Sequence, residues 1–393
     1  MRQKVVIIGR GYNNRLALLR PLGELGYDIS IVILEHYPKR PIDSYSKYVT
    51  NCYICSEETE EALLYVLMTN CIDEKQKVIL IPSEDFSVYV LDKNLNKLKK
   101  FFLFPNIHER QGAVVEWMDK GKQKALARTM GLNVANSRSV EITNGKYVVP
   151  SDILYPCFIK AQTFVLKAKN VLSKCDNEQE LITVLDSVCE QHKDIVLMIE
   201  EFKEIERELS VGGFSDGNDV IIPGVIEKLT IANGVTMKGK IVSTNGYEEI
   251  IDKFKRFIRG IDFVGIFDID FYYSGNEFYF CELNLRYGGT GFAYIKKGIN
   301  FPEMLARTLS GRSINDVNKS VTSDSFCVNE DVCLRNWYYG RMTTKEYLHV
   351  MESSDIYIYR DCIDSVPEKM YNRIFLKMRI KRIVKKIIKI IVK

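Results

Sequence analysis

Short apolar runs that alternate with helical stretches constrain the fold of this chain more than any other feature. Turn-forming residues follow the runs, so each run is predicted to be a short buried strand. The runs cover residues 4–8, 27–34 and 78–81, with a helical stretch at 15–25 and turns at Gly9 and Pro82. Alternation of this kind is typical of a parallel sheet with helices on both faces. The sequence therefore predicts a Rossmann-like, doubly wound domain over residues 1–112.

The middle of the chain shows a different pattern, in which strands follow one another across short turns. A helix is expected over residues 117–130, because Gly131 stands where a helix C-terminal cap belongs. A hairpin is expected from residues 263–273 and 277–285, because Gly275 and Asn276 favour a tight turn. Further strands are expected at 155–161, 165–169, 196–200, 208–214 and 220–227, with helices at 177–190 and 252–259.

The composition fits a globular chain of two or three domains. The 393 residues are 46% hydrophobic and 27% charged, and the formal net charge of +4 does not by itself indicate a nucleic-acid partner. No secretory signal pattern begins the sequence, so the ten cysteines are expected to be free thiols in a cytoplasmic protein. Cys52 and Cys55 have zinc-like spacing, but no second cysteine pair or histidine pair accompanies them.

A row of polar side chains follows the second strand of the predicted hairpin. Because residues two apart on a strand point the same way, Glu282, Asn284 and Arg286 share one face. Asp270 lies on the partner strand, where it can meet Glu282 across the hairpin. Two carboxylates and an amide oxygen suit magnesium that bridges phosphates, and the arginine can neutralise a transferring phosphoryl group. The alternative is a buried salt-bridge cluster or a solvated sheet face.

Charged residues near the ends of other predicted elements add to this row, although each of them alone is usually just solvated. Lys160 ends one apolar strand, and Lys120 opens a helical segment forty residues earlier. A second apolar strand ends in a charged group, and another acid follows it after a short turn: Glu200, Glu201, Lys203 and Glu208.

Together, in this order and spacing, these residues resemble the ATP-grasp superfamily, which includes biotin carboxylase, the large subunit of carbamoyl-phosphate synthetase and D-alanine–D-alanine ligase. The resemblance covers roughly residues 1–310. It implies a fold of mixed α/β and α+β class, in which a Rossmann-like pre-ATP-grasp domain (1–112) precedes an ATP-grasp domain (113–345). A small nucleotide lid subdomain is expected at about 135–203, and a C-terminal extension (346–393) ends in a basic amphipathic helix at 376–393.

The resemblance implies a nucleotide site. Lys120 and Lys160 would hold the phosphates of ATP, with Lys228 as a weaker candidate for the same contact. Glu208 would bind the ribose hydroxyls. The hinge against the adenine would be formed, mainly through backbone groups, by Glu200, Glu201 and Lys203.

The same resemblance implies a metal and a catalytic group. The ion would be Mg²⁺, with Mn²⁺ as the alternative, held by Asp270, Glu282 and Asn284. Arg286, with Asn284 beside it, would act in catalysis by facing the transferring phosphoryl group and the substrate carboxylate. Backbone groups of residues 287–291 would serve the acceptor substrate.

The loop after Lys160 departs from the family pattern. The family usually covers the triphosphate with a glycine-rich loop at this point, whereas residues 161–169 contain no glycine. Lys167 and Lys169 would compensate by charge.

The first loop offers a second interpretation. Gly9 and Gly11 make up two-thirds of a dinucleotide fingerprint, and Glu35 stands roughly where a ribose acid would lie, but Asn14 replaces the third glycine. We expect this loop to contribute to a carboxylate or amine pocket rather than to bind NAD.

The predicted function is that of an ATP-dependent ligase that joins a carboxylate to an amine through an acyl phosphate. Phosphorylation turns a poor electrophile into a mixed anhydride, and positioning and electrostatics suffice for catalysis. The expected partners are ATP, a small carboxylate and an amine, with a homodimer as the expected assembly. Two alternatives remain: a kinase that stops at a stable phosphorylated product, and a membrane-docked ATP-binding module with little catalysis.

The last part of the chain is basic and amphipathic. Residues 377–393 contain eight Lys or Arg and no acid. On a helical wheel one side is apolar, formed by Ile380, Ile383, Val384, Ile387, Ile388, Ile390 and Ile391. Such a helix is too polar to span a bilayer. It either packs on the body or docks on an anionic membrane, and nucleic acid is not expected because interleaved aromatics are missing.

Membrane docking would make the protein peripheral at the inner face of the membrane. An acceptor in a cell-envelope or polysaccharide precursor would then be within reach, a situation that resembles that of D-aspartate ligase-like members of the superfamily.

Overall fold

The computed structural model of the chain describes residues 2–34, 40–163 and 171–391. The predicted ribose acid Glu35, the lysines Lys167 and Lys169, and the strand expected at 165–169 lie outside these ranges.

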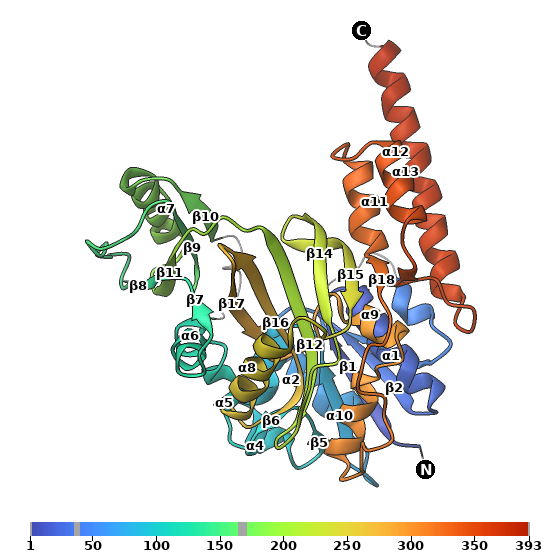
Figure 1. Cartoon of the computed structure of the whole chain (residues 1–393). Helices are drawn as coiled ribbons and strands as arrows, with labels where there is room; N and C mark the ends of the chain where they lie inside the picture. The colour runs from blue at the N-terminus through green and yellow to red at the C-terminus, as the bar shows by residue number, and fades with distance from the viewer. Residues whose placement is uncertain (1, 35–39, 164–170, 392–393) are drawn as a thin grey trace.

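The N-terminal part is a five-stranded parallel sheet, ordered β3-β2-β1-β4-β5 (Figure 1). Alternate residues of β1 enter different cores: Val5 and Ile7 pack with helix α1, whereas Val6 and Ile8 pack with α2 and α3. The sheet is therefore covered on both faces, and the predicted doubly wound arrangement is confirmed. The strands are β1 (Lys4–Gly9), β2 (Asp28–Ile33), β3 (Val49–Ile54), β4 (Val78–Pro82) and β5 (Phe102–Leu103); the helices are α1 (Tyr12–Glu24), η1 (Ile42–Tyr45), α2 (Glu60–Asn70), α3 (Asp85–Lys93) and α4 (Leu95–Leu98).

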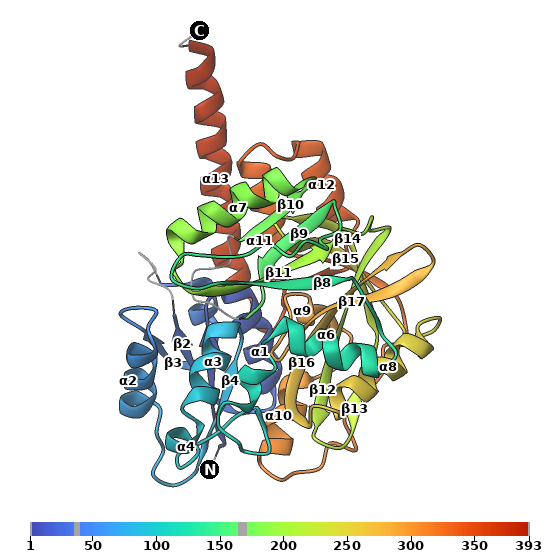
Figure 2. The ribbon, with the colours of Figure 1, turned by 90° about the vertical axis from the view of Figure 1, so that its left-hand side faces the viewer.

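The middle of the chain forms two further sheets. The larger has the order β19-β18-β15-β14-β12-β16-β17-β7, and the smaller has the order β10-β9-β11-β8 with helix α7 packed on it. In Figure 2 the smaller sheet and α7 lie above β2, β3 and β4 of the N-terminal sheet. The strands of the smaller sheet are β8 (Ser137–Ile142), β9 (Cys157–Ala161), β10 (Leu172–Cys175) and β11 (Ile195–Glu201); α7 is Glu178–Gln191.

The larger sheet is mostly antiparallel. Its strands are β7 (Asn133–Val134), β12 (Arg207–Asp216), β14 (Val225–Ala232), β15 (Val235–Val242), β16 (Phe263–Ser274), β17 (Glu277–Asn284), β18 (Ser325–Val328) and β19 (Ile356–Tyr357), with β6 (Asn106–Ile107) on β16 and β13 (Val220–Ile221) on β12. Helices around it are α5 (Ala113–Glu116), α6 (Lys120–Thr129), α8 (Glu248–Arg259), α9 (Gly291–Lys296) and α10 (Phe301–Leu309).

The hairpin of β16 and β17 is present as predicted. Gly275 and Asn276, at the centre of the turn, both have positive φ (55° and 67°), as a tight hairpin turn requires. Asp270 pairs in register with Glu282, and the register shifts directly after Asp270, so that Cys281 is an extra residue in β17. The bulge keeps Glu282 on the same sheet face as Tyr279, three residues earlier.

Two predicted elements differ in their bounds. The strand expected at 220–227 is interrupted between β13 and β14, because Pro223 has no N–H to donate to a ladder. The helix expected at 117–130 begins only at Lys120, because the Asp119 side chain accepts a hydrogen bond from the backbone N–H of Lys122 and caps it. Its end is as predicted: Gly131 has φ 75° directly after the C-terminal cap.

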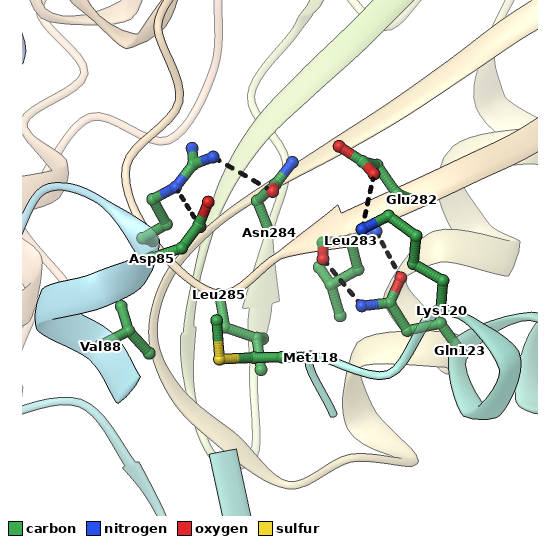
Figure 3. A pocket seen from close by; sticks show the side chains of 10 residues that line it. Asp85, Val88, Met118, Lys120, Gln123, Glu282, Leu283, Asn284 and Leu285 are labelled. Atoms are coloured by element: carbon green, nitrogen blue, oxygen red, sulfur yellow. Dashed lines mark hydrogen bonds and ion pairs between the residues drawn. The ribbon is translucent and has the colours of Figure 1, made fainter. Parts of the chain in front are cut away.

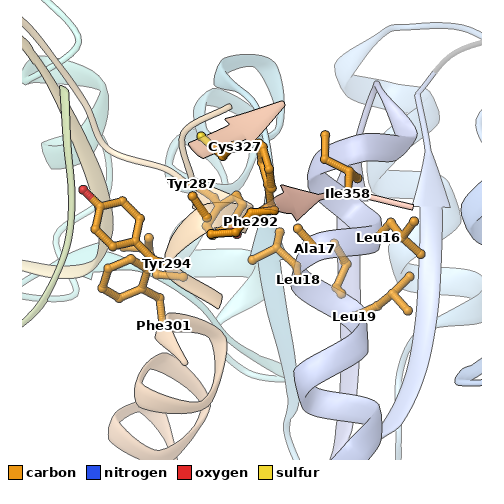
Figure 4. Close-up of a cluster of buried hydrophobic side chains, with 14 of the residues drawn as sticks. Leu16, Ala17, Leu18, Leu19, Tyr287, Phe292, Tyr294, Phe301, Cys327 and Ile358 are labelled. Atoms are coloured by element: carbon orange, nitrogen blue, oxygen red, sulfur yellow. The ribbon is translucent and has the colours of Figure 1, made fainter. Parts of the chain in front are cut away.

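A shared core joins the N-terminal sheet to the rest of the chain. One face of α1 packs against aromatic side chains of α9 and α10 and against residues next to β18 and β19 (Figure 4). The members of this core drawn there include Leu16, Leu19, Phe292, Phe301 and Ile358. This core therefore contains residues from both sides of the predicted domain boundaries at 112 and 345. The boundaries themselves stay predictions.

The C-terminal helices are α11 (Glu330–Tyr338), α12 (Thr344–Glu352) and α13 (Val366–Ile391). Helix α13 begins ten residues before the predicted start at 376. Its first turns lie on the body, because the Tyr371 hydroxyl donates to the backbone oxygen of Glu330 at 2.9 Å. Its last turns project beyond the body in both views (Figures 1 and 2). Within the described ranges, no helix combines the length and the apolar character needed to cross a membrane.

Candidate active site

Three rows of paired residues cross one face of the larger sheet and build the site. Paired residues on antiparallel strands share a face, and successive rows are about 7 Å apart along the strands. The first row holds Glu208, Tyr272 and Tyr279; the second row holds Ser210, Asp270 and Glu282; the third row holds Gly212, Asp268 and Asn284. The predicted carboxylate pair, Asp270 and Glu282, therefore meets across the hairpin, and Asn284 follows on the same face.

A small pocket opens at the β17 end of the second and third rows (Figure 3). Lys120, at the start of α6, lies 3.5 Å from Glu282 between side-chain N and O atoms. Burial alone would raise the pKa of Glu282, but Lys120 and then Lys160 hold it below its usual value. The pocket is lined by Asp85, Val88, Met118, Lys120, Gln123, Glu282, Leu283, Asn284, Leu285 and Arg286.

Arg286 connects this pocket to the N-terminal sheet. Its Nε donates to Asp85 at 2.7 Å, and Nη2 donates to the side-chain oxygen of Asn284 at 3.2 Å. Burial alone would lower the pKa of Arg286, but Asp85 raises it above its ordinary value. Asp85 follows the strand end at Pro82, so the N-terminal sheet supplies an anion to the site; the sequence showed the strand end but not this contact.

Two lysines share one buried carboxylate behind the pocket. Glu200 accepts from Lys160 at 2.7 Å and pairs on its other side with Lys124 of α6. Burial, and then the charge of Lys160, lowers the pKa of Lys124 to about 7, while the nearby Cys281 and Glu282 oppose this change. Lys124 was missed from the sequence, although it lies four residues after Lys120 and so one helical turn further on.

Lys228 reaches the second row from β14. Its Nζ lies 2.5 Å from Asp270, and its strand position pairs with Glu208. Burial alone would lower the pKa of Lys228, but Asp270 raises it above its ordinary range. Burial raises the pKa of Glu208. Glu208, Lys228 and Asp270, predicted to contact ribose, phosphate and metal respectively, thus form one charged cluster on this face of the larger sheet.

The predicted hinge joins the smaller sheet to the larger one. The Glu201 side chain accepts from Lys203 at 2.6 Å and from Asn136 at 2.9 Å, and Lys203 lowers its pKa. The ammonium of Lys203 also lies over the ring of Tyr279 in the first row, 5.7 Å from its centre. Glu200 departs from its predicted neighbours, because its side chain faces the two lysines instead.

The predicted metal ligands are oxygen donors of the kind that a hard divalent ion prefers. Asp270 and Glu282 face each other in register, and Asn284 adds an amide oxygen next to Glu282. Among the described residues no group of three or more His, Cys, Asp or Glu side chains is arranged to hold a metal ion, and Lys228 and Lys120 already contact the two carboxylates. The metal role of these residues stays a prediction. Cys52 and Cys55 lie in and beside β3, away from this face.

Three polar groups beside the third row were missed from the sequence. Asp268 is 7% exposed, and within the described ranges no group donates a hydrogen bond to it. The hydroxyls of Ser210 and Tyr287 are also buried without a hydrogen-bond partner in those ranges. Burial, and then the charge of Asp270, raises the pKa of Asp268. The signal was available: Asp268 lies two residues before Asp270 on one strand and so shares its face.

No family model matches the chain, but individual proteins do. It is 30% identical over 153 residues to the carbamoyl phosphate synthase large chain of Clostridium botulinum, which covers 37% of this chain and 14% of that one. It is 23% identical over 219 residues to the C-terminal section of the same enzyme from Aquifex aeolicus, which covers 52% of this chain and 40% of that one. The chain therefore spans well under half the length of these curated relatives.

Solved structures share most of this arrangement. An N5-carboxyaminoimidazole synthetase from Staphylococcus aureus, complexed with ADP, superposes with a TM-score of 0.63 at 16% identity, covering 87% of both chains. Biotin carboxylase from Campylobacter jejuni gives 0.63 at 18% identity, covering 82% of this chain and 74% of that one. An L-amino acid ligase from Bacillus licheniformis gives 0.60 at 14% identity, covering 83% and 79%.

A Rossmann-like sheet followed by two sheets that bring lysines toward a row of acids defines a class of nucleotide-binding proteins. In sequence over part of its length, and in fold over most of it, this chain resembles the ATP-grasp proteins.

Proposed function

We propose that this protein is an ATP-dependent carboxylate–amine ligase that works through an acyl phosphate. The observation that supports it most is the pocket where Lys120, Glu282, Asn284 and Arg286 meet. Cations, carboxylates and an amide converge there from α6 and β17, as the transfer of a phosphoryl group requires. The names of the similar proteins, which include synthases, a carboxylase and a ligase, favour the same reaction class.

In this reaction a carboxylate oxygen attacks the γ-phosphorus of ATP and ADP leaves. An amine nitrogen then attacks the acyl carbon, the bond from carbon to the phosphate oxygen breaks, and phosphate leaves while a proton passes to solvent. Arg286 would hold the phosphoryl oxygens and the substrate carboxylate, and Asp85 and Asn284 hold its guanidinium in place. Mg²⁺, or Mn²⁺ in its place, would offset phosphate charge when held by Asp270, Glu282 and Asn284.

Lys120 and Lys160 would bind the phosphates in this proposal, with Lys228 as an additional contact. The pairing of each of them with a carboxylate supports this role, because a polyphosphate can replace a carboxylate as the anionic partner. Glu201 and Lys203 would meet the adenine at the hinge, Glu208 the ribose, and Glu200 would serve by holding Lys160 and Lys124.

The test is a screen for ADP release with pairs of amino acids and small acids as carboxylate and amine. Release of ADP and free phosphate that needs both substrates supports the ligase, and the variant Glu282→Gln is expected to lose it. A stable phosphorylated product would point to a kinase instead. ATP binding without turnover under every pair would point to a binding module and overturn the proposal.

We also propose that residues 376–393 dock on an anionic membrane. One side of α13 is used against the body: the Phe375 ring stacks on Tyr347 with centroids 5.7 Å apart, and the Arg382 guanidinium lies over Trp337 at 4.4 Å. At about 100° per residue, Leu376, Ile380 and Val384 lie about 100–180° around the helix from Phe375. They are 55%, 53% and 47% exposed, so this apolar side is not part of the core.

The charges beside this apolar side favour a membrane over a second copy of the helix. Lys377, Arg379 and Lys381 are exposed, and no acid follows residue 376. Two such helices would repel each other, whereas each cation near an anionic surface contributes roughly 1 kcal/mol. Docking would place the protein in the cytoplasm at the inner face of the membrane, where it could add an amino acid to a cell-envelope or polysaccharide precursor.

Co-sedimentation with phosphatidylcholine vesicles, with and without phosphatidylserine, tests the docking. The full chain is expected to bind only the anionic vesicles, and Ile380→Ser with Val384→Ser, or Lys377→Glu with Lys381→Glu, should weaken binding. Lys319→Glu with Lys345→Glu, on exposed sites elsewhere, is the control. Equal sedimentation of all variants contradicts docking. The proposed homodimer is tested separately by light scattering.

A further inference from the structure

Asp268 stands one row beyond the proposed metal carboxylates, on the side away from the hinge. The rows run from Glu208 near the hinge, through Asp270, to Asp268 and Asn284, and the chain then continues from Asn284 through Arg286 to the turn at Gly288. That turn passes directly over Asp268, because a Cβ at Gly288 would lie only 2.2 Å from its Oδ1 atom. Asp268 therefore lies between the phosphoryl-transfer residues and a close backbone turn.

The charges around Asp268 are already committed to other groups. Lys228 contacts Asp270, Lys120 contacts Glu282, and Arg286 contacts Asp85. In the part of the chain that the structure describes, Asp268 has no ion pair and no hydrogen bond, although it is only 7% exposed. A buried carboxylate without a partner is costly, so this position calls for a positive ligand that protein groups within the described ranges do not supply.

Two further buried hydroxyls, those of Ser210 and Tyr287, lack partners among the described residues, and burial and then the charge of Asp268 raise the pKa of Tyr287. The Ser210 hydroxyl belongs to the neighbouring row, on the same face, and the Tyr287 hydroxyl precedes the Gly288 turn; both residues are 1% exposed. Neither hydroxyl has a hydrogen-bond partner within the described ranges. Buried hydroxyls are usually satisfied, so the carboxylate and the two hydroxyls together indicate a site that a polar ligand completes.

An ammonium group fits this place better than a second metal ion does. Magnesium keeps several waters and needs open space around its ligands, and Asp270 is the more open of the two aspartates. Asp268 is covered by the Gly288 turn. An ammonium is compact and donates several hydrogen bonds, which matches one carboxylate with two hydroxyls.

We propose that Asp268 binds the positively charged amino group of the acceptor substrate, with Ser210 and Tyr287 as its neutral partners. The inference rests on the proposed ligase function and deepens it: it states that the acceptor arrives as a cation and is recognised by charge one row beyond the phosphoryl-transfer site. Asp268 is a binding residue in this proposal, and the phosphoryl transfer does not involve it. The bound ammonium releases one proton to solvent before its nitrogen attacks the acyl carbon and phosphate leaves.

Two nucleophiles of different charge distinguish the binding of the acceptor from the formation of the acyl phosphate. Ammonium is positively charged at neutral pH and is the smallest acceptor of the proposed class. Hydroxylamine is largely uncharged at neutral pH and traps an acyl phosphate as a hydroxamate. The experiment measures both products with ATP, Mg²⁺ and a mixture of the twenty common L-amino acids as carboxylates, using the full chain and the variants Asp268→Asn, Gly288→Ala and Asp252→Asn.

Asp268→Asn is expected to raise the KM for ammonium about 10-fold to 100-fold, the range expected when a hydrogen bond to a charged group is lost. Its hydroxamate yield should stay within about twofold of the unchanged chain. Gly288→Ala, which pushes on the carboxylate, should show the same selective loss, and Asp252→Asn, on an exposed helix position, should show none. The melting temperature of Asp268→Asn should not fall, because an unpaired buried charge is removed.

The outcomes distinguish this inference from the function on which it rests. An unchanged KM for ammonium in both Asp268→Asn and Gly288→Ala overturns the inference alone. Equal loss of amide and hydroxamate, or a raised requirement for Mg²⁺, shows that Asp268 serves phosphoryl transfer and also overturns it. If Asp268→Asn does not fold, Gly288→Ala decides. Absence of hydroxamate from the unchanged chain overturns the ligase function, and this inference with it.

Discussion

The two ends of the polar face are built in opposite ways. At the proposed nucleotide end, Lys160 and Lys124 share Glu200, Lys203 pairs with Glu201, and a similar pair joins Lys228 to Asp270. At the proposed acceptor end, Asp268 and the hydroxyls of Ser210 and Tyr287 have no partner in the described part of the chain. One end is electrostatically complete without a ligand, and the other is not.

This difference indicates how each end would respond to its ligand. Paired lysines stay extended and ordered, and a polyphosphate only exchanges one anion for another as their partner. The unpaired carboxylate of Asp268 instead keeps much of the cost of its burial until a cation arrives, because the charges of Lys228 and Arg286 offset that cost only in part. The first end should therefore tolerate the absence of ligand, and breaking any of its pairs should be costly. The second end should gain stability when its charge is removed.

The largest expected effect is on the stability of the proposed nucleotide end. Glu200→Gln would leave Lys124 and Lys160 close together without a carboxylate, and Lys124 is only 2% exposed. Loss of one partner from a buried pair costs about 3–5 kcal/mol, so the free energy of unfolding should fall by about that amount. Urea unfolding followed by circular dichroism measures it, with Glu190→Gln on exposed α7 as the control.

A second variant sharpens this prediction. Glu200→Gln combined with Lys124→Met removes one of the two uncompensated charges, so the double variant should be more stable than Glu200→Gln alone. If the double variant is less stable by the sum of the single effects, the two lysines do not share the carboxylate, and the nucleotide end is not built as a unit.

The next effect is on turnover, at the point where the two ends meet. Arg286→Lys keeps a positive charge but loses the fork that contacts Asp85 and Asn284 together. Removal of one electrostatic donor from an active site typically lowers kcat by about 100-fold or more, and we expect a loss of that size. The measurement is ADP release at saturating substrates, and Arg259→Lys, at the exposed end of α8, is the matched control.

A kcat for Arg286→Lys within about threefold of the unchanged chain would mean that only charge matters at this position. In that case the contact with Asp85 is a domain contact, and the link between Arg286 and phosphoryl transfer has to be given up.

The sequence predicted the parts of this site that local rules control. Glu282 and Asn284 share a face because of the strand period, and the turn at Gly275 and Asn276 sets the start of the hairpin register. The bulge at Cys281 then shifts that register by one residue, and only this shift brings Asp270 opposite Glu282. The alternation of strands and helices likewise predicted the parallel sheet. In each case the residues that decide the structure are close together in the sequence.

The contacts that were missed join distant segments. Arg286 and Asp85 are 201 residues apart, and Lys124 is buried only because α6 packs beside Glu200 of the smaller sheet. Hydrophobic spacing does not reveal such pairs. Asp268 is a different case, because its face followed from that of Asp270. The sequence could not show that the nearby cations in the described ranges, Lys228, Lys120 and Arg286, each contact another carboxylate.

The smallest expected effect comes from Glu330, a third buried carboxylate after Glu200 and Asp268. Glu330 tests whether the lack of a cation, or the lack of hydrogen bonds, sets Asp268 apart. Glu330, at the start of α11, is 2% exposed, and its carboxylate accepts from the backbone N–H of Ile358 at 2.6 Å. Burial raises the pKa of Glu330 from 4.5 to about 7, and the N–H groups of Ile358 and Tyr359 partly oppose this.

The sign of the pH effect follows from that pKa. Between pH 4.5 and about 7 the unfolded chain has released the Glu330 proton while the folded chain still holds it. Stability should therefore fall as pH rises through this window and level off above it, by about 1–3 kcal/mol. Glu330→Gln, which cannot ionise but can still accept an N–H, should flatten this part of the profile, as thermal unfolding from pH 4 to pH 8 would measure. Glu352→Gln, at an exposed site, should leave the profile unchanged.

If Glu330→Gln has the same slope as the unchanged chain, backbone N–H groups alone satisfy a buried carboxylate fully. The absence of a cation beside Asp268 would then be a weaker sign of a ligand than the absence of hydrogen bonds to it.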